Sequence, residues 1–209
     1  MPLEPPSFSV GIFLTLVLIL LTSLGVFFVL VHRWTAGSRR YALREWCKRH
    51  GFRTVPAGGF PPIVGPVIAT PPLRSEQFTD GRMTLLRLHT ETGVWNVLAC
   101  RLETPWPTTG VRPVANPSSV LDLYSLASFP SLTTGERFVV YGTDSIAAKS
   151  LASSSLRALL PPDIGVLLAG QDMMLDFTAR PFDEIEFDRM TALAYQLVAH
   201  LPAVGKGKR

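Results

Sequence analysis

The sequence is poor in the residues and motifs that build catalytic and metal sites. It has two cysteines and four histidines among 209 residues, and neither set shows the spacing of a metal or redox site. The signatures G-x-x-x-x-G-K-S/T, G-x-G-x-x-G, G-x-S-x-G and H-E-x-x-H are all absent. We therefore expect no catalytic, metal-binding or cofactor-binding residues and no cofactor. Both cysteines, Cys47 and Cys100, are expected to be buried reduced thiols.

Charge is missing from one long stretch near the N-terminus. Phe8 to Val31 form a run of 24 residues without a charged side chain. As a helix this run would be roughly 36 Å long, enough to cross a hydrocarbon core of about 30 Å. We predict a transmembrane helix over 8–32, preceded by a short tail, 1–7. A cleaved signal peptide is the alternative, but such peptides carry positive charge before a shorter apolar run.

Basic residues follow the apolar run at once. The stretch 33–53 holds seven basic residues and one acidic residue, whereas the tail before the run carries only Glu4. Positive residues close to a span stay on the cytoplasmic side. We therefore predict a bacterial inner-membrane protein with its N-terminus outside and its C-terminal domain in the cytoplasm. The basic stretch favours anionic lipid headgroups and not nucleic acid as its partner. The residues predicted to contact the membrane surface are Arg33, Trp34, Arg39, Arg40, Arg44 and Lys48.

Small residues recur along one side of the predicted span. Their 4-3-4-3 spacing, at 100° per residue, places them within an arc of about 80°. Small residues let the backbones of two spans approach closely. Chance alignment is the alternative, because glycine and threonine are common in spans. We predict an interface with other integral membrane subunits at Gly11, Thr15, Leu18, Thr22 and Gly25.

Residues 56–72 are rich in proline and glycine and yet apolar. Six prolines and three glycines in 17 residues exclude a continuous helix or a central strand. The apolar side chains need cover, which either the protein's own core or a partner supplies. We predict that the segment is a loop that docks on a partner; the alternative is that it wraps the protein's own core. The predicted docking residues are Phe60, Ile63, Val64, Val67 and Ile68.

The region after the span reads as a mixture of helices and strands. Ser38 is expected to cap a basic helix that ends near His50, whose apolar stripe lies on the membrane or packs on the domain. Strands are expected at 83–89 and 94–102 as a hairpin, at 136–142, and at 164–169 and 173–177 as a second hairpin. The stretch 104–117 reads as a loop, and 118–135 fits either a short helix or a turn.

Two helices are expected later in the chain. Asp144 begins one that runs to about Leu160, with a possible break at its three central serines, and Asp183 begins the other. Asp172 and Asp176 are expected to be solvated. Hairpin-joined strands indicate an antiparallel sheet with helices packed on one face. The predicted organisation is a basic juxtamembrane helix, 33–53, an α+β domain, 54–202, and a basic tail, 203–209.

Four segments carry a resemblance to known proteins. They read RRYALREWCKRHGF, ACRLETPWPTTGVRP, RFVVYGTDSIAAKSL and MMLDF…FDEIEFDRMTALAYQLVAHLP. Their order and spacing resemble a set of uncharacterised bacterial single-span membrane proteins with a cytoplasmic α+β domain. The resemblance spans most of residues 39–202. It implies a cytoplasmic domain on a membrane anchor and brings no catalytic residues and no activity.

Three functions are compatible with these patterns. The favoured one is a non-catalytic accessory subunit that stabilises a larger membrane complex, for instance a respiratory or photosynthetic assembly. The second is a free-standing, membrane-tethered module that binds a lipid or a small ligand. The third is an enzyme, which would need titratable residues converging in a cleft, and the sequence gives it the least support.

Overall fold

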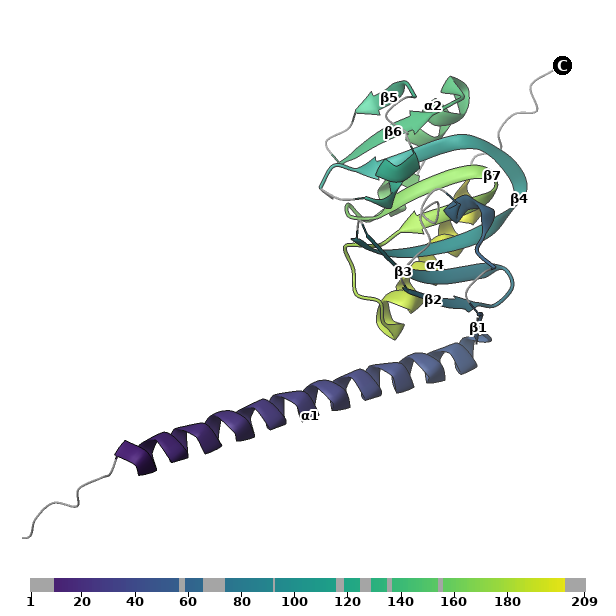
Figure 1. The fold of residues 1–209 in the computed structure, drawn as a ribbon. Coiled ribbons are helices and arrows are strands. Elements are labelled where there is room, and N and C mark those ends of the chain that lie inside the picture. Colours follow the sequence, from purple (N-terminus) through teal and green to yellow (C-terminus); the bar gives the residue numbers. More distant parts are fainter. Residues whose placement is uncertain are drawn as a thin grey trace, which may run out of the picture. The chain divides into compact units, whose positions relative to one another are not determined.

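The computed structural model describes residues 10–56, 59–65, 74–91, 93–115, 119–124, 129–134, 137–153 and 156–201. The chain divides into two compact units, Met1–Glu45 and Trp46–Arg209. Helix α1, Val10–His50, makes up the described part of the first unit, and its last turn belongs to the second (Figure 1). The helix is continuous through Ser38, where a new helix was expected to begin, because neither Gly37 nor Ser38 removes a helical hydrogen bond.

Helix α1 ends where the sequence predicts. Gly51 follows its last residue with a φ of 72°, a left-handed conformation that glycine adopts without steric cost. The Phe52 amide then donates to the Cys47 carbonyl oxygen at 2.8 Å. This turn directs the chain into the first short strand of the domain.

Within the residues that the structure describes, the domain is built on an antiparallel sheet of seven strands. The strand order is β1-β2-β3-β4-β6-β5, and β7 pairs with β4 outside this path. The strands are β1 (Arg53–Thr54), β2 (Arg74–Thr79), β3 (Met83–Thr90), β4 (Gly93–Pro113), β5 (Ser131–Thr134), β6 (Phe138–Gly142) and β7 (Gly165–Asp176). The predicted hairpin is confirmed as β3 and β4, with His89 opposite Val94.

Strand β4 is much longer than predicted, because the stretch expected to be a loop continues it to Pro113. Its first part pairs with β3, its last part pairs with β6, and β7 runs beside both (Figure 1). Pro105 and Pro107 lie at two register shifts on either side of Trp106. A proline is tolerated there because an irregularity leaves ladder positions unpaired.

Strand β7 corrects a second prediction, since Gly165–Asp176 is one bent strand and not part of a hairpin. It pairs with β4 from Val166 to Asp176. Gly170 lies at the bend with a φ of 58°, which accommodates the change of direction within the strand.

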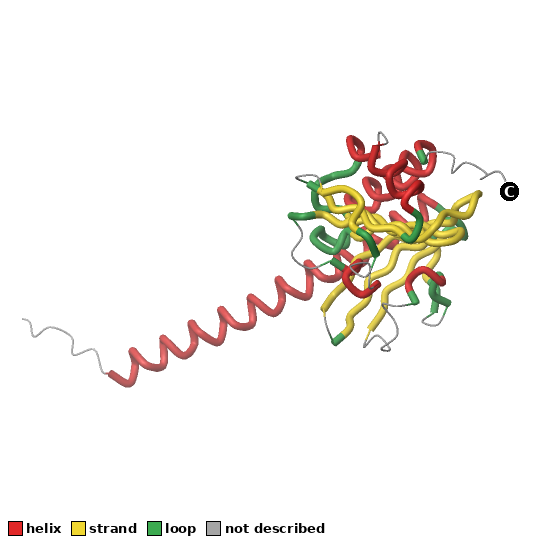
Figure 2. Tube along the Cα trace, turned by 90° about the horizontal axis from the view of Figure 1, so that it is seen from above, coloured by secondary structure: helices red, strands yellow, loops and turns green. Residues whose placement is uncertain are grey.

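The α-helices lie on one face of the sheet, as the sequence predicts. They are α2 (Ser145–Ser153), α3 (Leu156–Leu159) and α4 (Glu184–His200). Val166 and Leu168 face these helices, whereas Leu167 between them faces two short 3₁₀ segments. These are η1 (Pro62–Val64) and η2 (Val120–Tyr124). Figure 2 shows helical segments on both sides of the strands.

Helix starts follow the predicted caps. The Asp183 side chain accepts a hydrogen bond from the Glu186 amide, and Asp144 accepts from the amides of Ile146 and Ala147. Helix α2 ends at Ser153 and α3 begins at Leu156, and the two serines between them, where the break was expected, lie outside the described residues.

Candidate functional site

The apolar part of α1 has the properties of a membrane span. The segment Gly11–Val31 is long and apolar enough to cross a bilayer, and none of it is buried in the protein. A row of exposed leucine, isoleucine and phenylalanine side chains over this length has no counterpart on an ordinary soluble surface. The segment is therefore suited to a surrounding of lipid or of other apolar helices.

Hydroxyl groups on the small-residue stripe are satisfied inside the helix itself. Thr15 donates to the Gly11 carbonyl oxygen at 2.8 Å, and Thr22 donates to the Leu18 carbonyl oxygen at 2.9 Å. No unpaired hydroxyl group would then enter hydrocarbon, where it would be costly. At Gly25 an added Cβ would meet no atom within 4 Å. The predicted interface at Gly11, Thr15, Leu18, Thr22 and Gly25 stays a prediction.

The predicted membrane-surface residues are partly within the described side chains. Trp34 is 78% exposed, and Arg44 and Lys48 are exposed. The side chains of Arg33, Arg39 and Arg40 lie outside the described ones. Lipid contact through this group stays a prediction.

The proline-rich segment turns out to cover its own core where it is described. Ile63 and Val64 are 5% and 0% exposed and pack with Leu86, Leu121 and Met174. Two polar contacts hold the segment down. The Tyr124 hydroxyl group donates to the Ile63 carbonyl oxygen, and Gln77 Nε2 donates to the Gly59 carbonyl oxygen at 3.1 Å.

This burial makes Ile63 and Val64 unavailable to a partner, so the alternative reading holds for them and the docking prediction is corrected. Phe60 is half-buried against the same core. Val67 and Ile68 lie outside the described residues.

The last turn of α1 is anchored in the domain by Trp46. This side chain is 1% exposed, and its Nε1 donates to Asp188 Oδ1 on α4 at 2.6 Å. Its ring centroid lies 4.5 Å from that of His50, 5.0 Å from Phe52 and 5.2 Å from Phe187. Trp46 and Cys47 thus pack on the domain, which is one of the two alternatives that the sequence left open for the basic helix.

A buried carboxylate holds η2 against the sheet. Asp176, predicted to be solvated, is 0% exposed at the end of β7. Its Oδ2 accepts from Ser119 Oγ at 2.5 Å and from the Val120 amide at 2.9 Å, and its Oδ1 accepts from the Thr178 amide at 3.0 Å. A buried carboxylate is stable when several donors face it. Burial, with a contribution from the Asp176 charge, also raises the pKa of Tyr124 above its usual range.

A second polar cluster joins the end of β7 to α4. Arg180 donates to Asp163 at 2.7 and 2.8 Å and to Glu186 at 3.1 Å. The hydrogen bonds from Arg180 hold the pKa of Asp163 below its usual value, against the opposing effect of partial burial. In the same way, hydrogen bonds from Arg112 lower the pKa of Asp122 on η2. Both clusters bridge separate elements of the domain.

These ion pairs predict a loss of stability in acid. A carboxylate whose folded pKa is depressed contributes stability above its unfolded pKa of 3.8 and loses it as the pH falls through the lower folded value. Arg180→Gln should lower the free energy of unfolding by about 2 kcal/mol at pH 6. The difference from the wild type should shrink at pH 3, measured by urea denaturation.

Arg82, an exposed arginine on a turn, supplies the matched control. Arg82→Gln should leave the free energy of unfolding unchanged at both pH values. A constant Arg180→Gln effect across the whole pH range would contradict an ion-pair origin.

Both thiols are buried, as the sequence predicts, and both are free. Burial raises the pKa of Cys47 to about 11 and, together with the nearby Asp172 charge, that of Cys100 to about 12. Thiols with such values are almost entirely protonated near neutral pH and react slowly. They are structural core residues here. Among the described residues, no three His, Cys, Asp or Glu side chains are grouped as metal ligands would be.

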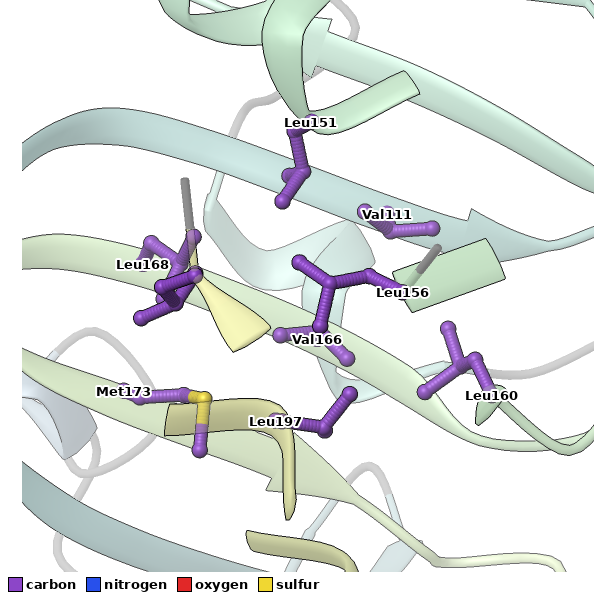
Figure 3. Close-up of a pocket in the computed structure, with 9 residues that line it drawn as sticks. Val111, Leu151, Leu156, Leu160, Val166, Leu168, Met173 and Leu197 are labelled. Carbon is purple, nitrogen blue, oxygen red and sulfur yellow. The ribbon is translucent and has the colours of Figure 1, made fainter. Parts of the chain in front are cut away.

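An apolar cavity lies between the helices and the sheet, and no pattern in the sequence predicts it. It is bounded by Leu151 of α2, Leu156 of α3, Leu197 of α4 and Val166 of β7 (Figure 3). It offers about 20 Å³ to the centre of a water-sized sphere, and about 340 Å³ of atom-free space when its open mouth is counted. All of the side chains that line it are aliphatic or methionine.

Comparison with known proteins finds a similar fold in a solved structure. No protein-family model matches the chain, and no curated protein matches it in sequence. The structure is similar to the crystal structure of the mycobacterial trehalose monomycolate transport factor A, TtfA, with a TM-score of 0.55. The two share 14% sequence identity, and the match covers 79% of this chain and 97% of that chain. The likeness shows a shared fold.

Proposed function

We propose that the protein is a non-catalytic, single-span accessory subunit that docks on a larger bacterial membrane complex and stabilises it. The observation that carries this proposal is the exposed segment Gly11–Val31, which has no cover within the protein. A span of this kind fixes the domain at a bilayer and offers a helix face to neighbouring spans.

The fold supports the same role. The domain shares its architecture with TtfA, which is named as a transport factor and not as an enzyme. A transport assembly is therefore a further candidate, beside respiratory and photosynthetic complexes, for the membrane complex on which this protein docks. The perturbed titratable groups described above are buried thiols, the buried Tyr124 hydroxyl group and hydrogen-bonded ion pairs, arrangements that serve packing and not proton transfer.

The orientation that we propose follows from charge. Seven basic residues and one acidic residue occupy 33–53, directly after the apolar run. This distribution favours an inner-membrane protein with the N-terminus outside and the domain in the cytoplasm. Anionic lipid headgroups are the electrostatic partner of the basic stretch in this arrangement.

The test of the accessory role is copurification in mild detergent. Gly11→Leu combined with Thr15→Leu should weaken recovery of partner membrane subunits about tenfold, corresponding to about 1.4 kcal/mol, because bulky residues separate the helix backbones. The amount of each copurified subunit would be measured by mass spectrometry.

Ser23→Leu is the matched control, because Ser23 lies in the same span but off the stripe. Its hydroxyl group also bonds only to the helix backbone, at the Ile19 and Leu20 carbonyl oxygens. Equal recovery of partner subunits with the double variant and with this control would contradict the predicted interface at the small-residue stripe. Purification of the unaltered chain without any partner would overturn the accessory role itself.

The alternative is a free-standing, membrane-tethered module that binds a lipid or another small ligand. The apolar cavity bounded by Leu151, Leu156, Leu197 and Val166 favours it. It predicts a chain that purifies alone and carries an apolar ligand.

A further inference from the structure

We infer that α1 pairs in parallel with α1 of a second copy of this chain, through a row of large side chains that recur at every seventh position. The inference rests on the membrane span of the proposed function and does not need a partner complex. All members of this heptad row are between 58% and 78% exposed. They are Phe13, Leu20, Phe27, Trp34 and Tyr41.

The spacing of the heptad row suits a long contact between two helices. Side chains seven residues apart drift by only about 20° around a straight helix, and a left-handed supercoil removes this drift. A parallel partner helix then meets every member of the row. At 100° per residue, the centre of the heptad row lies about 160° around the helix from the centre of the small-residue stripe. The two surfaces therefore lie on opposite sides of α1 and can bind different partners.

The part of the heptad row beyond the span identifies the surface. Within Gly11–Val31 lipid can cover any exposed apolar side chain. Among the described side chains of α1 past Val31, the exposed large hydrophobic ones are Trp34 and Tyr41, and both belong to the row. Tyr41 lies about 15 Å along the helix from Val31, whereas each polar layer of a bilayer is only about 5–8 Å deep. On a helix near the bilayer normal, lipid therefore covers Trp34 but not Tyr41.

A second copy has the form that this surface needs. The covering element has to be apolar beside Phe27 and has to continue as a helix out of the membrane as far as Tyr41. Helix α1 itself meets both conditions, because it is unbroken from Val10 to His50. Gly37 lies beside the row, three residues after Trp34, and an added Cβ there would meet no atom within 4 Å. A glycine at this position lets the backbone of a second helix approach closely.

The charges beside the heptad row favour a second copy in parallel. The basic stretch 33–53 holds one acidic residue, Glu45, four positions after Tyr41, and Arg40 comes directly before Tyr41. With Tyr41 at position a of a heptad, residue 40 is at position g and residue 45 at position e. Positions g and e on facing helices of a parallel coiled coil carry the ion pairs that set partner and orientation. Two copies of α1 therefore bring opposite charges together at 40 and 45, once on each side of the pair.

The experiment measures disulfide cross-linking between full-length copies in cell membranes after mild oxidation. Gly37→Cys places a thiol beside the heptad row. Ala36→Cys is the matched control, because position 36 lies about 150° around the helix from this part of the row. The native thiols, Cys47 and Cys100, are buried and are present in both samples. The linked fraction should be about tenfold higher with Gly37→Cys, because a disulfide requires the two Cα atoms to be close.

Charge reversal tests whether the partner is a second copy. Glu45→Arg and Arg40→Glu, each made in the Gly37→Cys chain, put like charges together on both sides of a self-pair. Each should lower its own cross-linking about tenfold. The two changes in one chain keep the net charge and should restore cross-linking. Produced together with different C-terminal tags, the two single variants should cross-link with each other and not with themselves.

Two checks accompany these variants. Circular dichroism of the purified chains shows that each variant folds, and protection of the C-terminal tag in intact cells shows that all variants share one orientation. Gly11→Leu combined with Thr15→Leu changes the opposite side of α1, so it should leave cross-linking through Gly37→Cys unchanged.

Equal cross-linking with Gly37→Cys and with Ala36→Cys would overturn the paired surface. Unchanged cross-linking in both single charge variants, or a mixture that does not link the two tags, would overturn the parallel second copy as its occupant. Cross-links are scored only between copies of this chain, so the result is independent of the copurification test. The pairing can therefore fail while the accessory role stands, and the accessory role can fail while the pairing stands.

Discussion

Replacing Trp46 with alanine should destabilise the domain by about 3–5 kcal/mol, a large part of the stability of a domain of this size. The reason is the position of the side chain on the last turn of α1, 1% exposed and packed on Phe52 and Phe187. The change leaves a cavity at the first residue of the compact domain and removes the hydrogen bond to Asp188. The measurement is denaturant-dependent hydrogen exchange of β4 in the full chain, held in a mild detergent.

Trp34 provides a control on the same helix, because it is 78% exposed. Trp34→Ala should change the free energy of unfolding by no more than about 0.5 kcal/mol. Trp46→Phe keeps an aromatic ring but loses the bond to Asp188, and should fall between the two. Equal stability of Trp46→Ala and Trp34→Ala would show that α1 is not anchored through Trp46.

Replacing Asp176 with alanine should cost about 3–5 kcal/mol. The substitution leaves three donors, on Ser119, Val120 and Thr178, without their acceptor. Two of these donors hold the start of η2, so amide exchange in 119–124 should rise more than exchange in α4. Asp176→Asn keeps one carbonyl oxygen as an acceptor and should lose less stability than Asp176→Ala.

Asp172 is the matched residue on the same strand, half-buried four positions earlier. Partial burial raises its pKa, so the charged form is disfavoured in the folded protein. Asp172→Asn should therefore be neutral or slightly stabilising at pH 7. A loss of stability at position 172 as large as that at 176 would contradict the distinct role of Asp176.

Local signals in the sequence predicted the elements that depend on local physics. The α+β class, the β3–β4 hairpin and the start of α4 at Asp183 are confirmed. In each case the deciding feature is short-range, namely alternation of side chains along a strand or a cap at a helix N-terminus. Gly51 after α1 belongs to the same group.

The elements that were predicted wrongly depend on pairing between strands that are distant in the sequence. Gly170 has the features of a turn, but β7 continues through it because β4 pairs with both halves. Pro105 and Pro107 are typical of a loop, yet they lie at irregularities of a strand that exchanges β3 for β6 as its neighbour. Neither partner strand can be identified from the local pattern.

The features of the candidate sites also divide into those that local sequence predicts and those that depend on distant residues. The apolar span can be read directly from composition, whereas the burial of Asp176 depends on Ser119, which lies 57 positions away. Trp46 lies near the end of α1, and its partner Asp188 is 142 positions away in the sequence. The cavity arises from the packing of α2, α3 and α4 over β7, and no single segment indicates it.

The central claim is that the apolar part of α1 holds the protein in a membrane. The most direct measurement is extraction of membranes from cells that produce the full chain, first with high salt and then with alkaline carbonate. A protein held by a membrane-spanning helix stays in the membrane pellet through both steps and enters solution only with detergent. Release of the intact 209-residue chain into the supernatant by salt or carbonate would contradict the account.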